Sequence, residues 1–163
     1  MSMYYFSTTR KGFSIVEIAI GVSIAALTIA FMSHAVVRFA SQGSENLERT
    51  RAILLAEEGV ELMRYLHDDS WTNLSSLTTG TKYYLLLSTT TVATTTTSSL
   101  IDGVYTRTIT TGDVYRATSG DDIVASTSGV SKAIDTNTKL VTATVTWGTA
   151  TSSVSMSEYL ANY

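Results

Sequence analysis

The chain has neither cysteine nor proline among its 163 residues. Without cysteine it forms no disulfide and no cysteine-based metal or redox centre. The lack of proline is unusual, because proline normally punctuates loops. Charged residues are also scarce, at 15% of the sequence, and the formal net charge is −3. A nucleic-acid-binding surface needs clustered lysine and arginine, so the composition gives no direct signal for a nucleic-acid partner.

A near-continuous apolar run, FSIVEIAIGVSIAALTIAFMSHAVV, occupies residues 13–37, and Glu17 is its only formal charge. As a helix this run would extend roughly 37 Å, which is enough to cross a hydrocarbon core of about 30 Å. Arg10 and Lys11 precede the run directly, whereas Arg38 is the only basic residue close behind it. By the positive-inside rule, we expect a single-pass membrane protein with a cytoplasmic N-terminus and an exported chain after the run.

Glu17 is the unusual feature of this run, because a charged side chain at bilayer depth costs about 3 kcal/mol or more and usually serves a function. Two simpler interpretations compete with a functional one. One is a cleavable signal peptide, for which Ser33-His34-Ala35 could pass as the cleavage site. The apolar core of a signal peptide has only about 7 to 15 residues, however, and the run before this site is longer. An ordinary signal anchor explains the run, but it explains neither Glu17 nor the residues just before the run.

Those preceding residues carry a resemblance. Residues 10–17, RKGFSIVE, resemble the class III signal of type IV pilins and type II secretion pseudopilins. In that family a membrane-embedded prepilin peptidase cuts after the glycine, and the new N-terminal residue is usually N-methylated. The resemblance implies a leader of residues 1–12 that is removed after Gly12. It also implies a mature chain that begins at an N-methylated Phe13, with Glu17 as its fifth residue.

The resemblance also implies a role for Glu17. In the family, the glutamate at this place meets the N-terminal amine of a neighbouring subunit in the filament, and a buried charge is tolerated only when it is paired. The implied protein is a structural subunit of a type IV pilus-like or type II secretion filament, without a cofactor. Many major pilins carry a proline where this chain has His34, and this difference favours a minor pilin or a pseudopilin.

Partners and location follow from the same resemblance. The implied partners are the prepilin peptidase, other pilin or pseudopilin subunits, the inner-membrane assembly platform and the lipid bilayer. The implied location is the inner membrane first, and then a cell-surface or periplasmic filament. The alternative is a signal-anchored extracytoplasmic binding or adhesion module that does not polymerise. The two hypotheses differ at Gly12 and Glu17, which only the filament requires.

The helix continues beyond the apolar run. Residues 44–69 have helical periodicity, with charged side chains on one face. Ser44 is a candidate N-cap if Gly43 breaks the helix. We expect a long helix over residues 13–68, roughly 80 Å in length. Its second half is amphipathic, and the apolar stripe consists of Ala52, Leu55, Ala56, Gly59, Leu62, Met63 and Leu66.

Residues 69–163 have the character of a β-rich globular domain. Threonine and serine dominate residues 88–99, which we expect to form an exposed loop or a hairpin edge. Apolar and polar residues then alternate in GVYTRTITT (103–111), KLVTATVTWG (139–148) and SVSMSEYL (153–160), a pattern that predicts strands. A turn over residues 148–152 would join the last two strands as an antiparallel hairpin.

The apolar face of such a sheet needs a cover, and the amphipathic helix has the only long apolar stripe. The sequence therefore predicts an α+β fold, with a small antiparallel sheet of residues 101–160 packed on helix 52–66. We expect Trp147 and Leu62 to lie in the shared core.

Motifs that carry chemistry are scarce. The sequence contains no nucleophile elbow, phosphate-binding loop or paired-carboxylate signature. His67, Asp68 and Ser70 look superficially catalytic, but polar residues are expected at a helix end. We therefore expect no enzyme activity and no catalytic, cofactor-binding or metal-ligating residues. Four aspartates could ligate calcium, but their spacing fits no defined calcium loop and we interpret them as solvated turn residues: Asp113, Asp121, Asp122 and Asp135.

Overall fold

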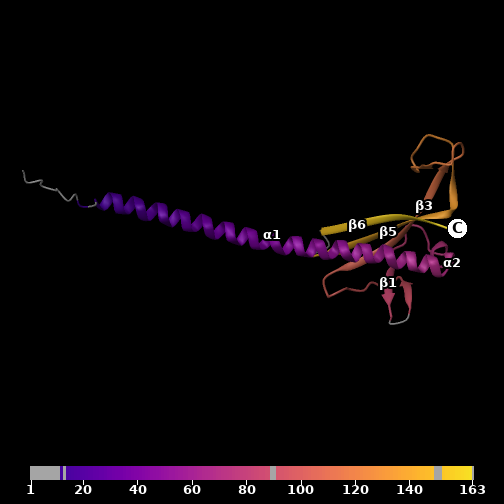
Figure 1. The fold of residues 1–163 in the computed structure, drawn as a ribbon, viewed down its shortest axis with the longest axis horizontal. Helices are drawn as coiled ribbons and strands as arrows, with labels where there is room; N and C mark the ends of the chain where they lie inside the picture. Colours follow the sequence, from indigo (N-terminus) through magenta and orange to yellow (C-terminus); the bar gives the residue numbers. More distant parts are fainter. Residues whose placement is uncertain (1–11, 13, 89–90, 149–151, 163) are drawn as a thin grey trace, which may run out of the picture. The chain divides into compact units, whose positions relative to one another are not determined.

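The computed structural model describes residues 12, 14–88, 91–148 and 152–162. It confirms the predicted α+β class (Figure 1), and the chain divides between Glu45 and Asn46 into a helical unit and a globular unit. The elements are α1 (Ile15–Asp69), α2 (Trp71–Ser75), β1 (Tyr84–Leu87), β2 (Val92–Thr95), β3 (Thr106–Ala117), β4 (Ile123–Val124), β5 (Lys132–Trp147) and β6 (Ser152–Ala161).

Helix α1 runs for 55 residues without interruption, close to the long helix expected over residues 13–68, so Gly43 does not break it and Ser44 does not cap it. A single glycine costs a helix only about 1 kcal/mol relative to alanine, and no proline is present to stop it. In the helical unit the side chains are exposed all around the helix; Ile15 and Phe31, for example, are 85% and 74% exposed. This part of α1 is long and apolar enough to cross a membrane, as expected for a single-pass membrane protein.

The globular unit contains two antiparallel sheets. A four-stranded sheet has the order β4-β3-β5-β6, and β1 pairs with β2 in a separate two-stranded sheet. Strands β3, β5 and β6 confirm the three predicted strands and their antiparallel pairing. A β-bulge between Asp113 and Val114 shifts the register of β3 against β5. The predicted turn falls partly on residues 149–151, which lie outside the described residues.

The segment between α1 and β3 is more ordered than its composition indicated. Helix α2 and strand β1 lie in sequence for which we expected no regular element. The Thr/Ser-rich stretch 88–99 was expected to be a loop or a hairpin edge, and part of it forms β2, the outer strand of the β1–β2 hairpin. Residues 89–90 lie outside the described residues.

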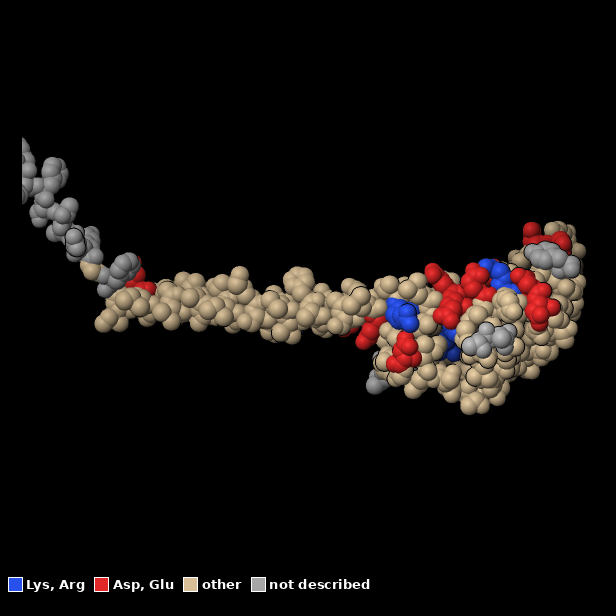
Figure 2. All heavy atoms as spheres, turned by 60° about the horizontal axis from the view of Figure 1, so that its bottom comes forward, with Lys and Arg blue, Asp and Glu red and all other residues tan. Residues whose placement is uncertain are grey.

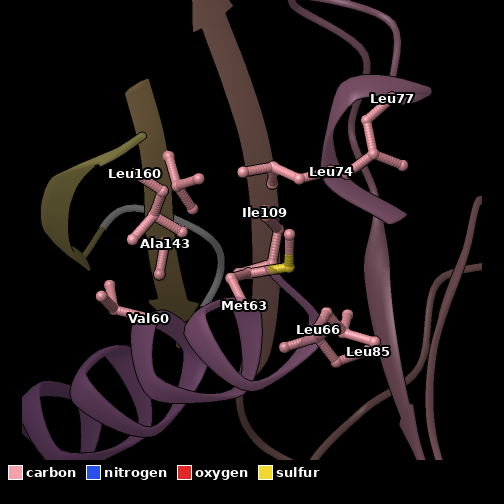
Figure 3. Packing of buried hydrophobic residues seen from close by; sticks show 10 residues of the cluster. Val60, Met63, Leu66, Leu74, Leu77, Leu85, Ile109, Ala143 and Leu160 are labelled. Carbon is pink, nitrogen blue, oxygen red and sulfur yellow. The ribbon is translucent and has the colours of Figure 1, made fainter. Parts of the chain in front are cut away.

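The apolar stripe of α1 packs against the four-stranded sheet, as predicted. Met63 and Leu66 contact Ile109 of β3 and Ala143 of β5 in one cluster, together with side chains from α2 and β1 (Figure 3). Leu62 lies at the margin of the stripe and is only partly buried. The buried residues of α1 are Ala52, Leu55, Ala56, Gly59, Val60, Met63 and Leu66.

Trp147 and Leu62 do not share a core, which corrects the sequence-based expectation. Trp147 belongs to a second cluster with Ala52, Leu55 and Ala56, whereas Leu62 packs at the edge of the first cluster. The C-terminal end of β5 lies beside the beginning of the buried stripe. Leu62 is about two helical turns further along α1. Helical periodicity identifies the buried face, but it does not say which strand end meets which turn.

Both clusters lie within residues 52–160, so we expect a soluble fragment of residues 46–163 to fold. In this fragment, Trp147→Ala should lower the free energy of unfolding by about 3 to 5 kcal/mol, because it empties a space between α1 and β5. Urea denaturation followed by circular dichroism measures the change. Tyr159→Ala is the matched control, since Tyr159 is 51% exposed and should cost little. Equal effects of the two substitutions would contradict the assignment of the second cluster.

Candidate functional site

The first turn of α1 presents one carboxylate among apolar side chains. Glu17 lies in this turn, and its backbone N–H donates to the Ser14 carbonyl at 3.0 Å. Its side chain is exposed, and it forms no ion pair with any described residue. The adjacent Val16 and Ile18 are 65% and 56% exposed. Once lipid or protein surrounds this turn, keeping the carboxylate charged is costly unless a cation from elsewhere pairs with it.

Gly12 is exposed, and a Cβ atom at this position would meet no other atom within 4 Å. Packing within the described chain therefore does not require a glycine there. Phe13, the predicted methylation site, lies outside the described residues, as do Arg10 and Lys11. Of the three site residues predicted from the sequence, the structure thus describes Gly12 and Glu17.

The aspartates considered as calcium ligands have other partners or lie apart. Asp113 accepts hydrogen bonds from Lys139 Nζ at 2.8 Å and Thr79 Oγ1 at 2.9 Å, and the lysine contact lowers the pKa of Asp113. Asp121 lies in a turn with a φ of 61°. The described residues contain no group of three or more potential ligands for a metal ion.

Asp135 has three hydrogen-bond donors. Its Oδ2 atom accepts from Thr138 Oγ1 at 2.6 Å and from Arg116 Nε at 2.7 Å, and its Oδ1 atom accepts from the Asn137 N–H at 2.9 Å. The Thr138 hydroxyl and the Arg116 guanidinium lower the pKa of Asp135 to about 2. This carboxylate therefore ties together the two strands of a long hairpin.

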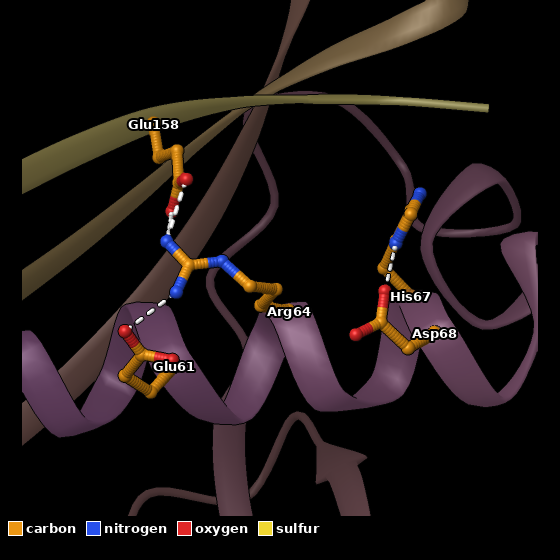
Figure 4. Close-up of polar contacts among 5 residues, drawn as sticks. All are labelled: Glu61, Arg64, His67, Asp68 and Glu158. Carbon is orange, nitrogen blue, oxygen red and sulfur yellow. Dashed lines mark hydrogen bonds and ion pairs between the residues drawn. The ribbon is translucent and has the colours of Figure 1, made fainter. Parts of the chain in front are cut away.

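His67 connects the end of α1 to neighbouring elements. Its Nε2 atom is 2.9 Å from the Ala161 carbonyl oxygen, at the end of β6. Its Nδ1 atom is 2.8 Å from Asp68 Oδ1 (Figure 4), and its ring packs edge-on to Trp71. The Nε2 contact links α1 to β6, and the packing on Trp71 links α1 to α2.

A buried arginine, which the sequence analysis did not single out, lies between α1 and β3. Arg107 is only 4% exposed, and its Nη1 atom donates to the Leu55 carbonyl at 3.2 Å and approaches Glu58 Oε1 at 3.3 Å. Gly59 makes room for it, since a Cβ there would lie 2.9 Å from Arg107 Cδ. Arg107 and Ile109 are two residues apart in the alternating stretch GVYTRTITT and so share one face of a strand, which was the signal available in the sequence.

A groove of about 500 Å³ lies between α1 and β6 in the globular unit. Arg64 crosses it, with Nη2 donating to both carboxylate oxygens of Glu158 at 2.6 and 2.7 Å and Nη1 donating to Glu61 at 2.6 Å (Figure 4). These contacts, first with Glu158 and then with Glu61, raise the pKa of Arg64. Glu57 and Leu54 also line the groove, which has no counterpart in the predicted site.

Together, the fold and these sites define a chain with one helix that could span a membrane and an α+β globular unit. Comparison with models of known protein families, with curated proteins and with solved structures finds no match.

The pKa of Asp135 generates a prediction for stability in acid. Folding lowers this pKa from an ordinary 3.8 to about 2, so the folded state binds the proton more weakly than the unfolded state. The stabilisation is fully present above about pH 4 and is lost as the pH falls from about 4 to about 2. Asp135→Asn in the 46–163 fragment should remove about 1 kcal/mol of this acid-dependent loss, after allowance for solvent screening.

Urea denaturation at a series of pH values between 6 and 2 measures this difference. Asp122→Asn is the control, because it makes the same change of charge at an exposed aspartate. The same pH dependence in Asp135→Asn and in the unsubstituted fragment would contradict the role given to this carboxylate.

Proposed function

We propose that this chain is a structural subunit of a type IV pilus-like or type II secretion filament, of the minor-pilin or pseudopilin kind. The observation that carries the proposal is the exposed Glu17 carboxylate in the first turn of an apolar helix that could span a membrane. It stands five residues after Gly12, whose glycine character nothing in the described chain requires. A recognition sequence for a processing enzyme would account for Gly12, and a neighbouring subunit would account for Glu17.

The proposed assembly is as follows. A separate prepilin peptidase removes residues 1–12 on the cytoplasmic side, and Phe13 becomes the N-methylated first residue. The apolar helix holds the subunit in the inner membrane until the assembly platform transfers it to a filament. There the Glu17 carboxylate of one subunit pairs with the Phe13 amine of its neighbour. A subunit stacked out of register would leave one charge unmatched, so this pair would fix the register.

The second candidate is an anchored binding or adhesion module. The groove between α1 and β6 favours it, because the groove offers charged and apolar groups to a partner without any filament. This alternative needs neither cleavage at Gly12 nor a partner for Glu17, and the two experiments below separate the candidates.

The first test concerns processing. Protein purified from membranes should begin at Phe13, and the loss of Arg10 and Lys11 would change the formal side-chain charge from −3 to −3 − 2 = −5. N-terminal sequencing locates the cut, and mass spectrometry detects a methyl group. Gly12→Val should leave the leader attached, because the substitution removes the glycine at the cut. A chain that starts at Met1 or after Ala35 would contradict the proposal.

The second test concerns the pairing of Glu17. Glu17→Gln keeps the size of the side chain but leaves the neighbour's amine unpaired, at a cost of roughly 3 to 5 kcal/mol for each contact. Because a filament repeats this contact at every subunit, we expect processed monomer to accumulate in the membrane while filaments become scarce. Immunoblots of sheared surface fractions and of membranes measure the two pools. Glu45→Gln, which makes the same change of charge elsewhere on α1, should assemble normally; a normal filament yield from Glu17→Gln would refute the pairing.

A further inference from the structure

Strand β6 forms a long open edge of the four-stranded sheet. It is 10 residues long, and its pairing with β5 continues without a register shift. Within the described residues, no strand pairs with its other side. Among the features that protect such an edge in natural proteins, β6 lacks lysine, proline and a bulge, and it carries one inward-facing charge, Glu158. The edge is therefore free to pair with another extended chain.

The backbone groups that face outward can be assigned. The Asn162 N–H donates to Asn137 next to β5, whereas the Ala161 carbonyl lies 2.9 Å from His67 on the outer side. Backbone groups alternate in direction along an antiparallel strand, so the N–H and C=O groups of odd-numbered residues point outward. His67 occupies the last of these positions. The open positions are Ser153, Ser155, Ser157 and Tyr159.

The groove between α1 and β6 lies beside this edge. Met156 and Glu158 line it from β6, and Leu54, Glu57 and Glu61 line it from α1. A strand added to β6 would lie 4.7 to 4.9 Å from it. Every second side chain of that strand would point toward the same face as Met156 and Glu158, into the groove. The edge would supply main-chain hydrogen bonds, and the groove would select side chains.

Carboxylates outnumber basic side chains in and beside the groove. Its carboxylates are Glu57, Glu58, Glu61 and Glu158, and its cations are Arg64 and the buried Arg107 behind it, so the local formal charge is −4 + 2 = −2. Figure 2 shows the red carboxylate side chains gathered on the globular unit around fewer blue basic ones. Leu54 and Met156 provide apolar surface between the charges.

A second copy of this chain is poorly suited to fill the groove. Most of its basic side chains in the globular unit are already engaged within the unit. Arg51 pairs with Asp102, Arg116 with Asp135 and Lys139 with Asp113. The described strands also contain no alternation of basic and apolar residues. Charge complementarity thus points to a different protein.

We propose that β6 and the adjacent groove bind an extended segment of a partner protein, by strand addition, and that this segment carries lysine or arginine at alternate positions. The segment pairs with the odd-numbered backbone groups of β6 and places its basic side chains against Glu57, Glu61 and Glu158. The inference concerns only the globular unit and does not rest on filament assembly.

The test uses the full chain in nonionic detergent and three short fluorescein-labelled peptides. One peptide alternates lysine with valine, one has the same composition with the lysines in a block, and one alternates glutamate with valine. Fluorescence anisotropy should show that the alternating lysine peptide binds at least about tenfold more tightly than either of the others. Equal binding of the alternating and block lysine peptides would overturn strand addition. The proposal would also be overturned if none of the three peptides bound.

Variants of the chain separate the two components of the site. Glu57→Gln with Glu61→Gln should weaken binding about tenfold or more, while Glu45→Gln, which lies outside the groove, should change it less than about twofold. Ser155→Pro removes an outward N–H at an edge position where proline is tolerated, and it should abolish binding that Ser155→Ala retains. If the Glu57→Gln, Glu61→Gln double variant and the Ser155→Pro variant both bind the peptide normally, the proposal fails.

A change to the peptide makes the result independent of how the variants fold. N-methylation of the peptide residues that face β6 should abolish binding, whereas N-methylation of the alternate residues should not. Equal binding of the two methylated peptides would overturn the proposal. Sedimentation velocity covers the remaining occupant. Dimerisation of the chain that Ser155→Pro prevents, without any peptide binding, would assign the edge to a second copy instead.

Discussion

The globular unit depends on the close approach of α1 to its four-stranded sheet. On the helix the small residues Ala52, Ala56 and Gly59 are buried: the two alanines cluster with Val145 and Trp147 of β5, and Gly59 faces Ala143. A Cβ at Gly59 would lie 3.1 Å from Ala143 Cβ and closer still to Arg107. Larger side chains would hold the helix away from the sheet, and both hydrophobic clusters would lose contacts across the gap. The small residues are therefore a requirement of the packing, although helix periodicity alone treats them as ordinary apolar positions.

One continuous helix serves two different surroundings. In the globular unit its apolar residues lie on one stripe and are buried, and its charged residues face outward. In the helical unit apolar side chains surround the axis and none of the described ones is buried, with Ile29 at 65% exposed. Exposure of so much apolar surface to water is unfavourable by about 25 cal/mol for each Å², so this part needs lipid or other protein around it. In such surroundings the Glu17 carboxylate is costly to keep charged unless a cation pairs with it.

Much of the fold could be predicted from the sequence because its signals are local. Alternation along β3, β5 and β6 identified both the strands and their inward residues, and periodicity identified the buried face of α1. Strand β1 was missed because Leu85, Leu86 and Leu87 form a run without alternation. The prediction that Trp147 and Leu62 share a core was wrong. Their separation depends on how far β5 extends along α1, which is a long-range property. The groove was missed for the same reason, since its residues are brought together only by the packing of β6 beside α1.

The two proposed interaction sites share a physical logic. Several basic side chains of the globular unit have partners within it: Arg64, Arg107, Arg116 and Lys139 each pair with a carboxylate. Glu17 at the start of α1 pairs with no described residue, and carboxylates outnumber cations in the groove beside the open edge of β6. In each place the missing group is a cation. At Glu17 a single positive charge would be enough, and in the proposed filament the amine at the end of a neighbouring chain would supply it. Along β6 the proposed partner needs basic side chains at alternate positions of a strand. A single amine does not provide them, whereas an extended basic segment does.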